Sequence, residues 1–228
     1  MAGTDIPFLR QLAPADADDL QRLVRIRSVS RGEPIVRAGA AGDDVALVLS
    51  GRVKLVAYGA DSREVVLAIR NPGELIGEMA ALGGQRRSAT AIAVDDVEAG
   101  YMRADELRSF IAEHPDAALV LIRMLVRRLL DATRDLVDLA TQDSVGMVAK
   151  RLLELATDHG RPFEGGTRIE LTLTQDELAS WTGATRETVS RALRLMRRVG
   201  WIATDHRTIT VLDPDGLRQR CGEGAPRR

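Results

Sequence analysis

The longest regular pattern of apolar positions in the chain runs from Asp116 to Ala140. This stretch contains no Gly or Pro and consists mainly of strong helix formers. Its apolar or small positions recur at alternating intervals of three and four residues, which is the heptad pattern of a coiled coil. The positions of this seam are Leu119, Ile122, Val126, Leu129, Thr133, Leu136 and Ala140. The pattern predicts a long helix that pairs with its copy in a homodimer.

One position of the seam, Thr133, is polar. A hydroxyl enclosed between two helices needs a hydrogen-bond partner. Two interpretations are open: the hydroxyl bonds to a carbonyl of its own helix, or it meets a ligand at the dimer axis.

A different pattern occupies residues 28–102, where short β-rich runs alternate with glycines. Many short strands with Gly turns predict an all-β barrel or jelly roll. Gly51 and Gly59 each lie in a sequence typical of a tight hairpin corner. The predicted strands are Glu33–Arg37, Val45–Leu49, Arg52–Tyr58, Glu64–Ile69, Ala89–Val94 and Glu98–Met102.

Helical patterns flank these two regions. Pro14–Arg27 predicts a short helix with acidic residues in its first turn, as the helix dipole prefers. After a short hinge at Thr141–Ser144, an amphipathic helix is expected at Val145–His159 and a strand at Ile169–Leu173.

Two short helices are then expected around Gly183. Thr174 with Glu177 forms a capping box that starts a helix over Gln175–Trp181. Gly183 suits the turn, and Thr185 suits the N-cap of a second helix that ends near Arg198. This is a helix-turn-helix pattern, whose alternative is a purely structural helical hairpin. Its shared core is expected from Leu178, Ala179, Val189, Ala192 and Leu193.

The exposed face of the second helix carries side chains that can read DNA. Near the start of a recognition helix, Arg donates two hydrogen bonds to guanine and Glu accepts from cytosine. Arg186, Glu187 and Arg191 lie on one such face. Candidates for phosphate contacts are Thr174, Thr185, Thr188 and Ser190. Beyond them, Trp201–Thr204 and Arg207–Leu212 predict a two-stranded wing, with His206 at its tip, and disorder is expected after Leu217.

Charge supports this assignment modestly. Residues 1–143 hold 18 basic and 22 acidic side chains, a net charge of −4, whereas residues 144–228 hold 14 and 11, a net charge of +3. Only the second part of the chain is therefore expected to meet a polyanion. The N-terminus resembles no leader and no run approaches a membrane span, so a cytoplasmic protein without membrane attachment is expected.

Several kinds of chemistry are not expected from these residues. Cys221 is the single cysteine, which excludes an internal disulfide and a cysteine-ligated iron–sulfur cluster. None of the histidines, His114, His159 and His206, falls within the predicted roll, so a metal-binding cupin is not expected. The sequence also lacks the usual hydrolase, phosphate-loop and metalloprotease motifs. We predict no metal and no catalytic residues.

The most informative part of the predicted roll is residues 72–91, PGELIGEMAALGGQRRSATA. A short helical turn is expected to begin at Gly77 and to be broken by Gly83 and Gly84. Free amides at a helix start, together with an arginine and a serine from the next strand, suit a phosphate. The alternative is an ordinary surface loop in which Arg87 pairs with Glu78.

This segment resembles the phosphate-binding cassette of cyclic-nucleotide-binding domains, and the chain from about Phe8 to Leu217 resembles the CRP/FNR family of bacterial regulators. The resemblance implies that the cassette holds a cyclic phosphate and that Glu78 binds the ribose 2′-hydroxyl. It also implies that Thr133 reaches the purine across the dimer; the neighbouring Ala132 lacks the polar group found in cAMP-binding members. The implied ligand residues are Gly77, Glu78, Met79, Arg87, Ser88, Ala89 and Thr133.

In that family the motif R-E-T-V-x-R reads a TGTGA-like half-site, and this chain has RETVSR at 186–191. The fold class expected is α+β: a jelly-roll-like cyclic-nucleotide-binding β-roll at 1–115, a dimerisation helix and hinge at 116–143, a winged helix-turn-helix at 144–220 and a disordered tail at 221–228. The expected function is a homodimeric transcription regulator of palindromic DNA, controlled by a cyclic nucleotide, with cAMP preferred and cGMP as the second choice. RNA polymerase is a further expected partner.

Three alternatives remain open at this point. The same fold can respond to another effector or act without one. The protein can be an architectural DNA-binding dimer with a vestigial roll, or an enzyme; retention of the four cassette residues Gly77, Glu78, Arg87 and Ser88 argues against the former, and the lack of a catalytic constellation argues against the latter.

Overall fold

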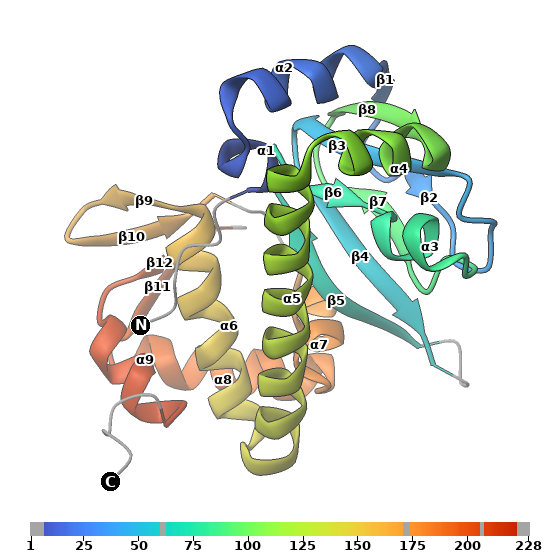
Figure 1. Cartoon of the computed structure of the whole chain (residues 1–228). Helices are drawn as coiled ribbons and strands as arrows, with labels where there is room; N and C mark the ends of the chain where they lie inside the picture. Colours follow the sequence, from blue (N-terminus) through green and yellow to red (C-terminus); the bar gives the residue numbers. More distant parts are fainter. Residues whose placement is uncertain (1–6, 60–62, 171–173, 206–207, 223–228) are drawn as a thin grey trace, which may run out of the picture. The chain divides into compact units, whose positions relative to one another are not determined.

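The computed structural model describes residues 7–59, 63–170, 174–205 and 208–222. The chain divides into two compact units, and the division falls at Asp131, inside the longest helix. Figure 1 shows that helix as one continuous rod. The first unit ends at Leu130 and the second begins at Asp131.

The first unit is built on two four-stranded antiparallel sheets, ordered β1-β8-β3-β6 and β2-β7-β4-β5. The strands are β1 Arg25–Val29, β2 Pro34–Val36, β3 Asp44–Ser50, β4 Val53–Tyr58, β5 Glu64–Arg70, β6 Leu75–Ile76, β7 Thr90–Ala93 and β8 Val97–Arg103. The helices are α1 Phe8–Gln11, α2 Pro14–Leu23, α3 Glu78–Gly83, α4 Ala104–Glu113 and the first part of α5 Pro115–Thr141.

Strand β3 shows why this unit holds together. Side chains alternate between the two faces of a strand. Ala46 and Val48 join a core shared by the two sheets, whereas Val45 and Leu47 join a second core made with the helices. Both faces of β3 are therefore covered, which fits its apolar sequence. The two sheets together form the predicted β-roll.

The second unit combines three helices around α6 with a small sheet, and α6 packs against α7, α8 and α9. Its sheet has the order β11-β12-β10-β9. Its elements after α5 are α6 Ser144–His159, β9 Gly160–Phe163, β10 Gly166–Ile169, α7 Gln175–Thr182, α8 Arg186–Arg198, β11 Ile202–Asp205, β12 Thr208–Val211 and α9 Pro214–Arg220. Helices α7 and α8 with the hairpin β11–β12 form the predicted winged helix-turn-helix.

The predicted fold class is confirmed, as are the long helix and each of the strands expected in the roll. The expected core of the helix-turn-helix is also present, because Leu178, Ala179, Val189, Ala192 and Leu193 are all buried. The domain boundaries drawn from the sequence remain predictions.

Four local expectations differ from the structure. The helix expected at Pro14–Arg27 ends at Leu23, because Arg25, Ile26 and Arg27 pair with β8 instead. Gly51 does not form a hairpin: β3 and β4 lie in different sheets, so the chain turns there from one sheet to the other. The second corner, at Gly59, does join the paired strands β4 and β5.

The remaining two differences lie in the second unit. The strand expected at Ile169–Leu173 is β10, which ends at Ile169; residues 171–173 lie outside the described residues. The disorder expected after Leu217 is wrong for the next residues, since α9 continues to Arg220 and Cys221 is only 4% exposed. The wing tip at His206 lies outside the described residues.

The coiled-coil pattern of α5 appears in the structure as a stripe of exposed apolar side chains. The buried side chains of this helix, Ala117, Val120, Leu121 and Met124, all lie in its first half. In contrast, Leu129 and Leu136 are each 68% exposed. Within the described residues, no helix has the length and apolar character needed to cross a membrane.

Candidate functional sites

The cassette predicted from residues 72–91 is formed by β6, α3 and the strand that follows them. Gly77 precedes α3 with φ of 86°, and Gly84 ends it with φ of 65°. Both are left-handed conformations that glycine adopts without steric cost. The expected short helix, with a glycine at each end, is therefore present, and Gly77 lies beside Arg87, in the segment between α3 and β7 Thr90–Ala93.

Arg87 is a buried cation held by hydrogen bonds to Gly77 and Asp44. Its side chain is only 3% exposed. Nη1 donates to the Gly77 carbonyl at 2.7 Å, and Nη2 donates to the carbonyl and to a carboxylate oxygen of Asp44, each at 2.5 Å. Asp44 is the first residue of β3 and lies 43 positions away in the chain. Sequence reasoning missed it, since nothing in the local pattern links it to the cassette.

Gly77 is required for this arrangement for a second reason. A Cβ at this position would lie 2.0 Å from Nη1 of Arg87. The guanidinium therefore lies directly on the glycine, and any larger residue would displace it. A buried guanidinium in a fixed position can present its donors to a carboxylate or to a phosphate in the same planar geometry.

Glu78 is also buried, with a side chain that is 3% exposed. Its partner is Arg128 of α5, whose Nη1 lies 2.5 Å from Oε1 of Glu78. Arg128 also approaches Glu74 at 3.4 Å and donates to the Leu75 carbonyl at 3.1 Å. The surface-loop interpretation required an Arg87–Glu78 pair; the structure instead gives each of these residues a different partner.

The other predicted ligand residues differ in exposure. Ser88 is exposed and Ala89 is half-buried beside Arg87 in the chain, whereas the Met79 side chain is 63% exposed. Thr133 is exposed on α5. The structure thus brings Gly77, Glu78 and Arg87 together, with Met79, Ser88 and Ala89 adjacent in sequence.

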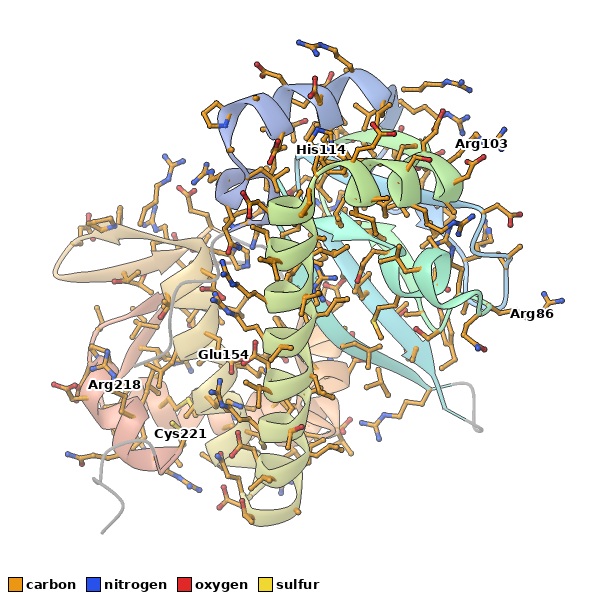
Figure 2. All side chains as sticks on the ribbon, in the orientation of Figure 1. Arg86, Arg103, His114, Glu154, Arg218 and Cys221 are labelled. Atoms are coloured by element: carbon orange, nitrogen blue, oxygen red, sulfur yellow. The ribbon has the colours of Figure 1, made fainter. Side chains whose placement is uncertain are left out.

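The loop from β2 to β3 contacts the segment that runs from Arg87 into β7. The Arg87 amide donates to the Ala40 carbonyl at 2.9 Å, and the Ala38 amide donates to the Thr90 hydroxyl at 3.0 Å. Arg86, labelled in Figure 2, is exposed and donates to the Gly39 carbonyl at 2.8 Å. The two consecutive arginines therefore differ: one is enclosed in the cassette and the other lies at its surface.

The second candidate site is the helix-turn-helix. The Thr174 hydroxyl accepts from the Glu177 amide, and the Glu177 carboxylate accepts from the Thr174 amide, which is the predicted capping box. Gly183 turns the chain with φ of 64°. Thr185 caps α8 by accepting from the Thr188 amide. Local sequence signals therefore account for both ends of the turn.

The face of α8 expected to read bases is exposed. Arg186, Glu187 and Arg191 all lie on the surface, and Arg186 approaches Asp176 at 3.8 Å. Arg191 donates to the Thr188 hydroxyl at 3.2 Å. Glu187 accepts hydrogen bonds from its own amide and from the Thr185 hydroxyl, and these lower the pKa of its carboxyl group. Glu187 is therefore an anionic acceptor at neutral pH, as a contact to cytosine requires.

Beyond the RETVSR motif, the last two turns of α8 carry Arg194, Arg197 and Arg198. A shallow hollow there is lined by Arg191, Arg194, Leu195, Arg197 and Arg198. Arg197 also donates to the Thr204 hydroxyl of β11 at 3.3 Å. These positive charges suit the phosphate backbone, which positions a protein on DNA without reading sequence.

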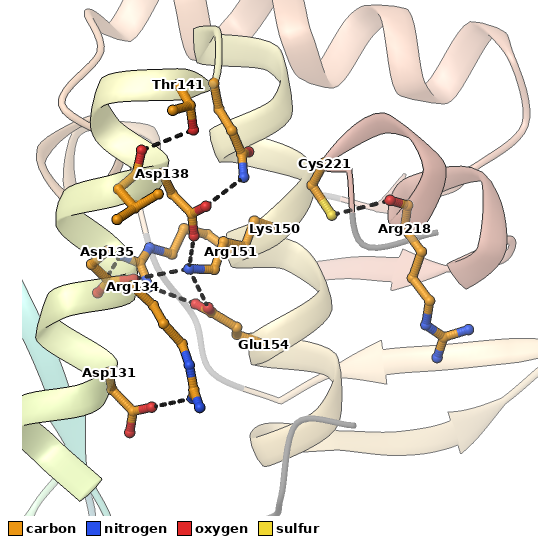
Figure 3. A network of polar contacts seen from close by, with 12 residues as sticks. Asp131, Arg134, Asp135, Asp138, Thr141, Lys150, Arg151, Glu154, Arg218 and Cys221 are labelled. Atoms are coloured by element: carbon orange, nitrogen blue, oxygen red, sulfur yellow. Dashed lines mark hydrogen bonds and ion pairs between the residues drawn. The ribbon is translucent and has the colours of Figure 1, made fainter. Parts of the chain in front are cut away.

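The second unit also contains a buried cluster of charges, shown in Figure 3. Lys150 of α6, with a side chain 9% exposed, contacts Asp135 at 2.9 Å and Asp138 at 2.5 Å. Arg151 contacts Asp135 at 2.9 Å and Glu154 at 2.6 Å. Although burial opposes it, the nearby Arg151 and Lys150 lower the pKa of Asp135. The cluster fixes the end of α5 against α6 and was not expected from the sequence.

Comparison with known proteins identifies the same two kinds of domain. A family model described as a cyclic nucleotide-binding domain matches residues 26–114, and one described as a Crp-like helix-turn-helix domain matches residues 147–220. The CRP-like cAMP-activated global transcriptional regulator of Mycobacterium tuberculosis is 36% identical over 190 residues, covering 83% of this chain and 85% of the relative. The chain belongs to the CRP/FNR family of transcription regulators.

Other similar proteins belong to the same family. The cyclic AMP receptor protein of Thermus thermophilus is 33% identical over 205 residues, covering 90% of this chain and 92% of the relative. A crystal structure of a CRP/FNR-family transcriptional regulator from the same organism has a TM-score of 0.70 at 31% identity, covering 87% of this chain and 98% of that one. A structure of CooA from Carboxydothermus hydrogenoformans shares the fold, with a TM-score of 0.78 at 24% identity over 95% of this chain and 96% of that one. As a member of this family, the protein has a domain of the cyclic-nucleotide-binding type and a DNA-binding domain.

Proposed function

We propose that this regulator is a cytoplasmic homodimer that binds cAMP in its first unit and a palindromic site with TGTGA-like half-sites in its second unit. The observation that carries the ligand proposal is the cassette itself. The Arg87 guanidinium is buried and bonds the Gly77 carbonyl and Asp44, and Glu78, the residue after Gly77, provides a buried carboxylate. An anionic phosphate and a sugar hydroxyl are the groups that such a pair recognises.

The preference for cAMP over cGMP follows from relatives whose names identify them as cAMP-activated or as a cyclic AMP receptor. In this assignment Arg87 contacts the cyclic phosphate, Glu78 contacts the ribose, and Thr133 of the partner subunit contacts the base. Isothermal titration with cAMP and cGMP tests this assignment. We expect binding that is lost in Arg87→Ala and kept in Arg86→Ala, a control with the same charge change in the neighbouring exposed residue. Absence of binding by either nucleotide to the wild-type protein would contradict the proposal.

The homodimer is supported by the exposed apolar stripe of α5. Leu129 and Leu136 lie on the same heptad seam and are each 68% exposed, which is unfavourable in water unless a second helix covers them. We expect the wild-type protein to sediment as a dimer and Leu136→Glu to shift it toward the monomer. Arg123→Glu, a change at an exposed position outside the seam, serves as the control.

DNA recognition is assigned to Arg186, Glu187 and Arg191, and the phosphate contacts to Thr174, Thr185, Thr188 and Ser190. In a dimer with two recognition helices, the half-sites lie about one turn, or roughly 34 Å, apart. Fluorescence anisotropy with such a palindrome tests the assignment, with and without cAMP. We expect tighter binding with the nucleotide present; equal binding to a scrambled site of the same length would contradict specific readout.

A regulator of this kind acts by a shift of populations. The nucleotide binds one conformation more tightly and so favours it, and that conformation presents the recognition helices to DNA. RNA polymerase is the proposed partner at the promoter. We propose no metal and no catalysis, and incubation with cAMP or cGMP should therefore leave the nucleotide unhydrolysed.

A further inference from the structure

The Asp44 carboxylate pairs with the guanidinium of Arg87, the group to which a cyclic phosphate would bind. Its Oδ1 lies 2.5 Å from Nη2 of Arg87. The two side chains differ in exposure, at 3% for Arg87 and 47% for Asp44. This pair joins the start of β3 to the cassette and was not expected from the sequence.

The buried position of Arg87 explains why it needs an anion. A charge removed from water without a partner carries a large desolvation cost. The guanidinium is held inside the unit, because its Nη1 donates to the Gly77 carbonyl and lies where a Cβ of that residue would be. Asp44 satisfies this requirement within the unit itself, so that the cation remains neutralised when no other anion is bound.

The exposed position of Asp44 means that this partner can be replaced. A carboxylate that is about half exposed can be solvated by water when it leaves the ion pair, whereas the guanidinium remains fixed. The Asp44 carboxylate accepts from Nη2 of Arg87, so a phosphate that takes this donor must displace it. If both remained, two negative charges would lie side by side.

We propose that Asp44 is an internal competitor for the anionic group of the effector, and that it sets the affinity of the cassette by exchanging with the phosphate at Arg87. This inference rests on the proposed function, in which a cyclic nucleotide binds at Arg87. The incoming monoanion replaces one negative charge with another, and the buried cation is paired in both states.

The opposite role for Asp44 is to position Arg87, in which case its loss would weaken binding. The geometry favours competition. Two backbone carbonyls, those of Gly77 and Asp44 itself, already fix the guanidinium at 2.7 Å and 2.5 Å. These contacts survive when the Asp44 side chain is changed, so the carboxylate is not required to hold Arg87 in place.

The test is isothermal titration of cAMP and cGMP into wild type, Asp44→Asn and Asp43→Asn. The asparagine keeps the shape and one oxygen acceptor of Asp44 but removes the charge. Asp43 is the adjacent exposed residue, so its variant controls for the general loss of one negative charge near the site. We expect Asp44→Asn to bind about tenfold more tightly than Asp43→Asn, the change that corresponds to one charged hydrogen bond.

Failure of the competitor role and failure of the proposed function give different results. Equal or weaker binding in Asp44→Asn, with wild-type binding intact, would overturn the competitor role and leave the nucleotide site standing. Tighter binding in Asp44→Asn than in both wild type and Asp43→Asn would support the competitor role. No binding in any of the three proteins would overturn the proposed function and the competitor role with it. Asp44→Ser, with a shorter side chain, repeats the measurement, and thermal unfolding confirms that each variant is folded.

Discussion

The two units of the protein place their functional charges in opposite ways. In the first unit, Arg87 and Glu78 are buried, and each is paired with a residue from another element, Asp44 or Arg128. In the second unit, Arg186, Glu187 and Arg191 are exposed on one helix. A small ligand is recognised by enclosing it, whereas DNA is too large to enclose and must be met by a protruding face.

This difference has a consequence for stability. Buried charges in the first unit serve both binding and folding, because removing one leaves its partner without compensation. The exposed charges of α8 can be changed at little cost to folding. We therefore expect substitutions in the cassette to affect stability and ligand binding together, and substitutions on α8 to affect DNA binding alone.

The largest expected effect is on nucleotide binding. In Gly77→Ala, the new Cβ would lie 2.0 Å from Nη1 of Arg87 and must displace the guanidinium. We expect no measurable heat on titration with cAMP. Gly84→Ala is the matched control, because Gly84 also has positive φ, at 65°, but no atom of the described residues lies within 4 Å of its missing Cβ. It should lose some stability and retain binding; equal loss in both variants would show that backbone strain, and not Arg87, is responsible.

The next largest effect is on the stability of the first unit. Arg128→Met removes the cation that contacts Glu78 and Glu74, whose side chains are 3% and 8% exposed. We expect the free energy of unfolding to fall by about 3–5 kcal/mol, as for other broken buried ion pairs. Urea unfolding monitored by circular dichroism measures it. Arg123→Met, an exposed position on the same helix, should remain within about 0.5 kcal/mol of wild type.

A smaller effect is expected for DNA binding. Arg191→Ala should weaken binding to the specific palindrome by about 1–3 kcal/mol and relax base preference at one position of each half-site. Arg161→Ala removes the same charge from an exposed position on β9 and controls for general attraction to DNA. If both variants lose affinity equally on specific and scrambled sites, Arg191 contacts phosphate and does not read a base.

Acid should affect the second unit through Asp135. Its pKa is lowered in the folded state, so folding favours the ionised carboxyl group. The resulting stability is fully present above the unfolded pKa of about 3.9 and is lost as the pH falls through the lower folded value. Asp135→Asn should flatten this acid limb in urea unfolding measured between about pH 5 and pH 3. An unchanged limb would assign acid sensitivity to other carboxylates.

The smallest effect is expected at the helix cap. Thr174→Ala removes the acceptor for the Glu177 amide and should cost about 1 kcal/mol of stability. Thr174→Ser keeps the hydroxyl, so its stability in thermal unfolding should match that of the wild type. Because this cap lies at an exposed helix start, its loss should leave nucleotide binding unchanged.

The local features of the second site were predictable from sequence. The capping box at Thr174, the turn at Gly183 and the exposed face of α8 all depend on residues within a few positions of each other. The cassette was predictable only in part. The short helix between Gly77 and Gly84 was expected, but the partners of Arg87 and Glu78 lie 43 and 50 residues away.

The wrong predictions also concern residues whose structure depends on distant parts of the chain. Arg25, Ile26 and Arg27 continue a plausible helix locally, yet pairing with β8 makes them a strand. Gly51 stands in a plausible hairpin, yet its two strands join different sheets. The tail predicted after Leu217 is wrong for the last turn of α9, because nothing in the composition of this turn shows that Cys221 is buried.

The sequence by itself indicated the family through its resemblance, the two kinds of domain, the long seam of α5 and the motifs in which both candidate sites lie. Periodicity and short motifs are sufficient for these, because they record local geometry. Only the tertiary structure decided which charges compensate one another. It placed Asp44 on Arg87, Arg128 on Glu78, and Lys150 between Asp135 and Asp138. Such pairs depend on distant strands and helices being brought together, since a buried charge is neutralised by what folding places beside it and not by its neighbours in the chain.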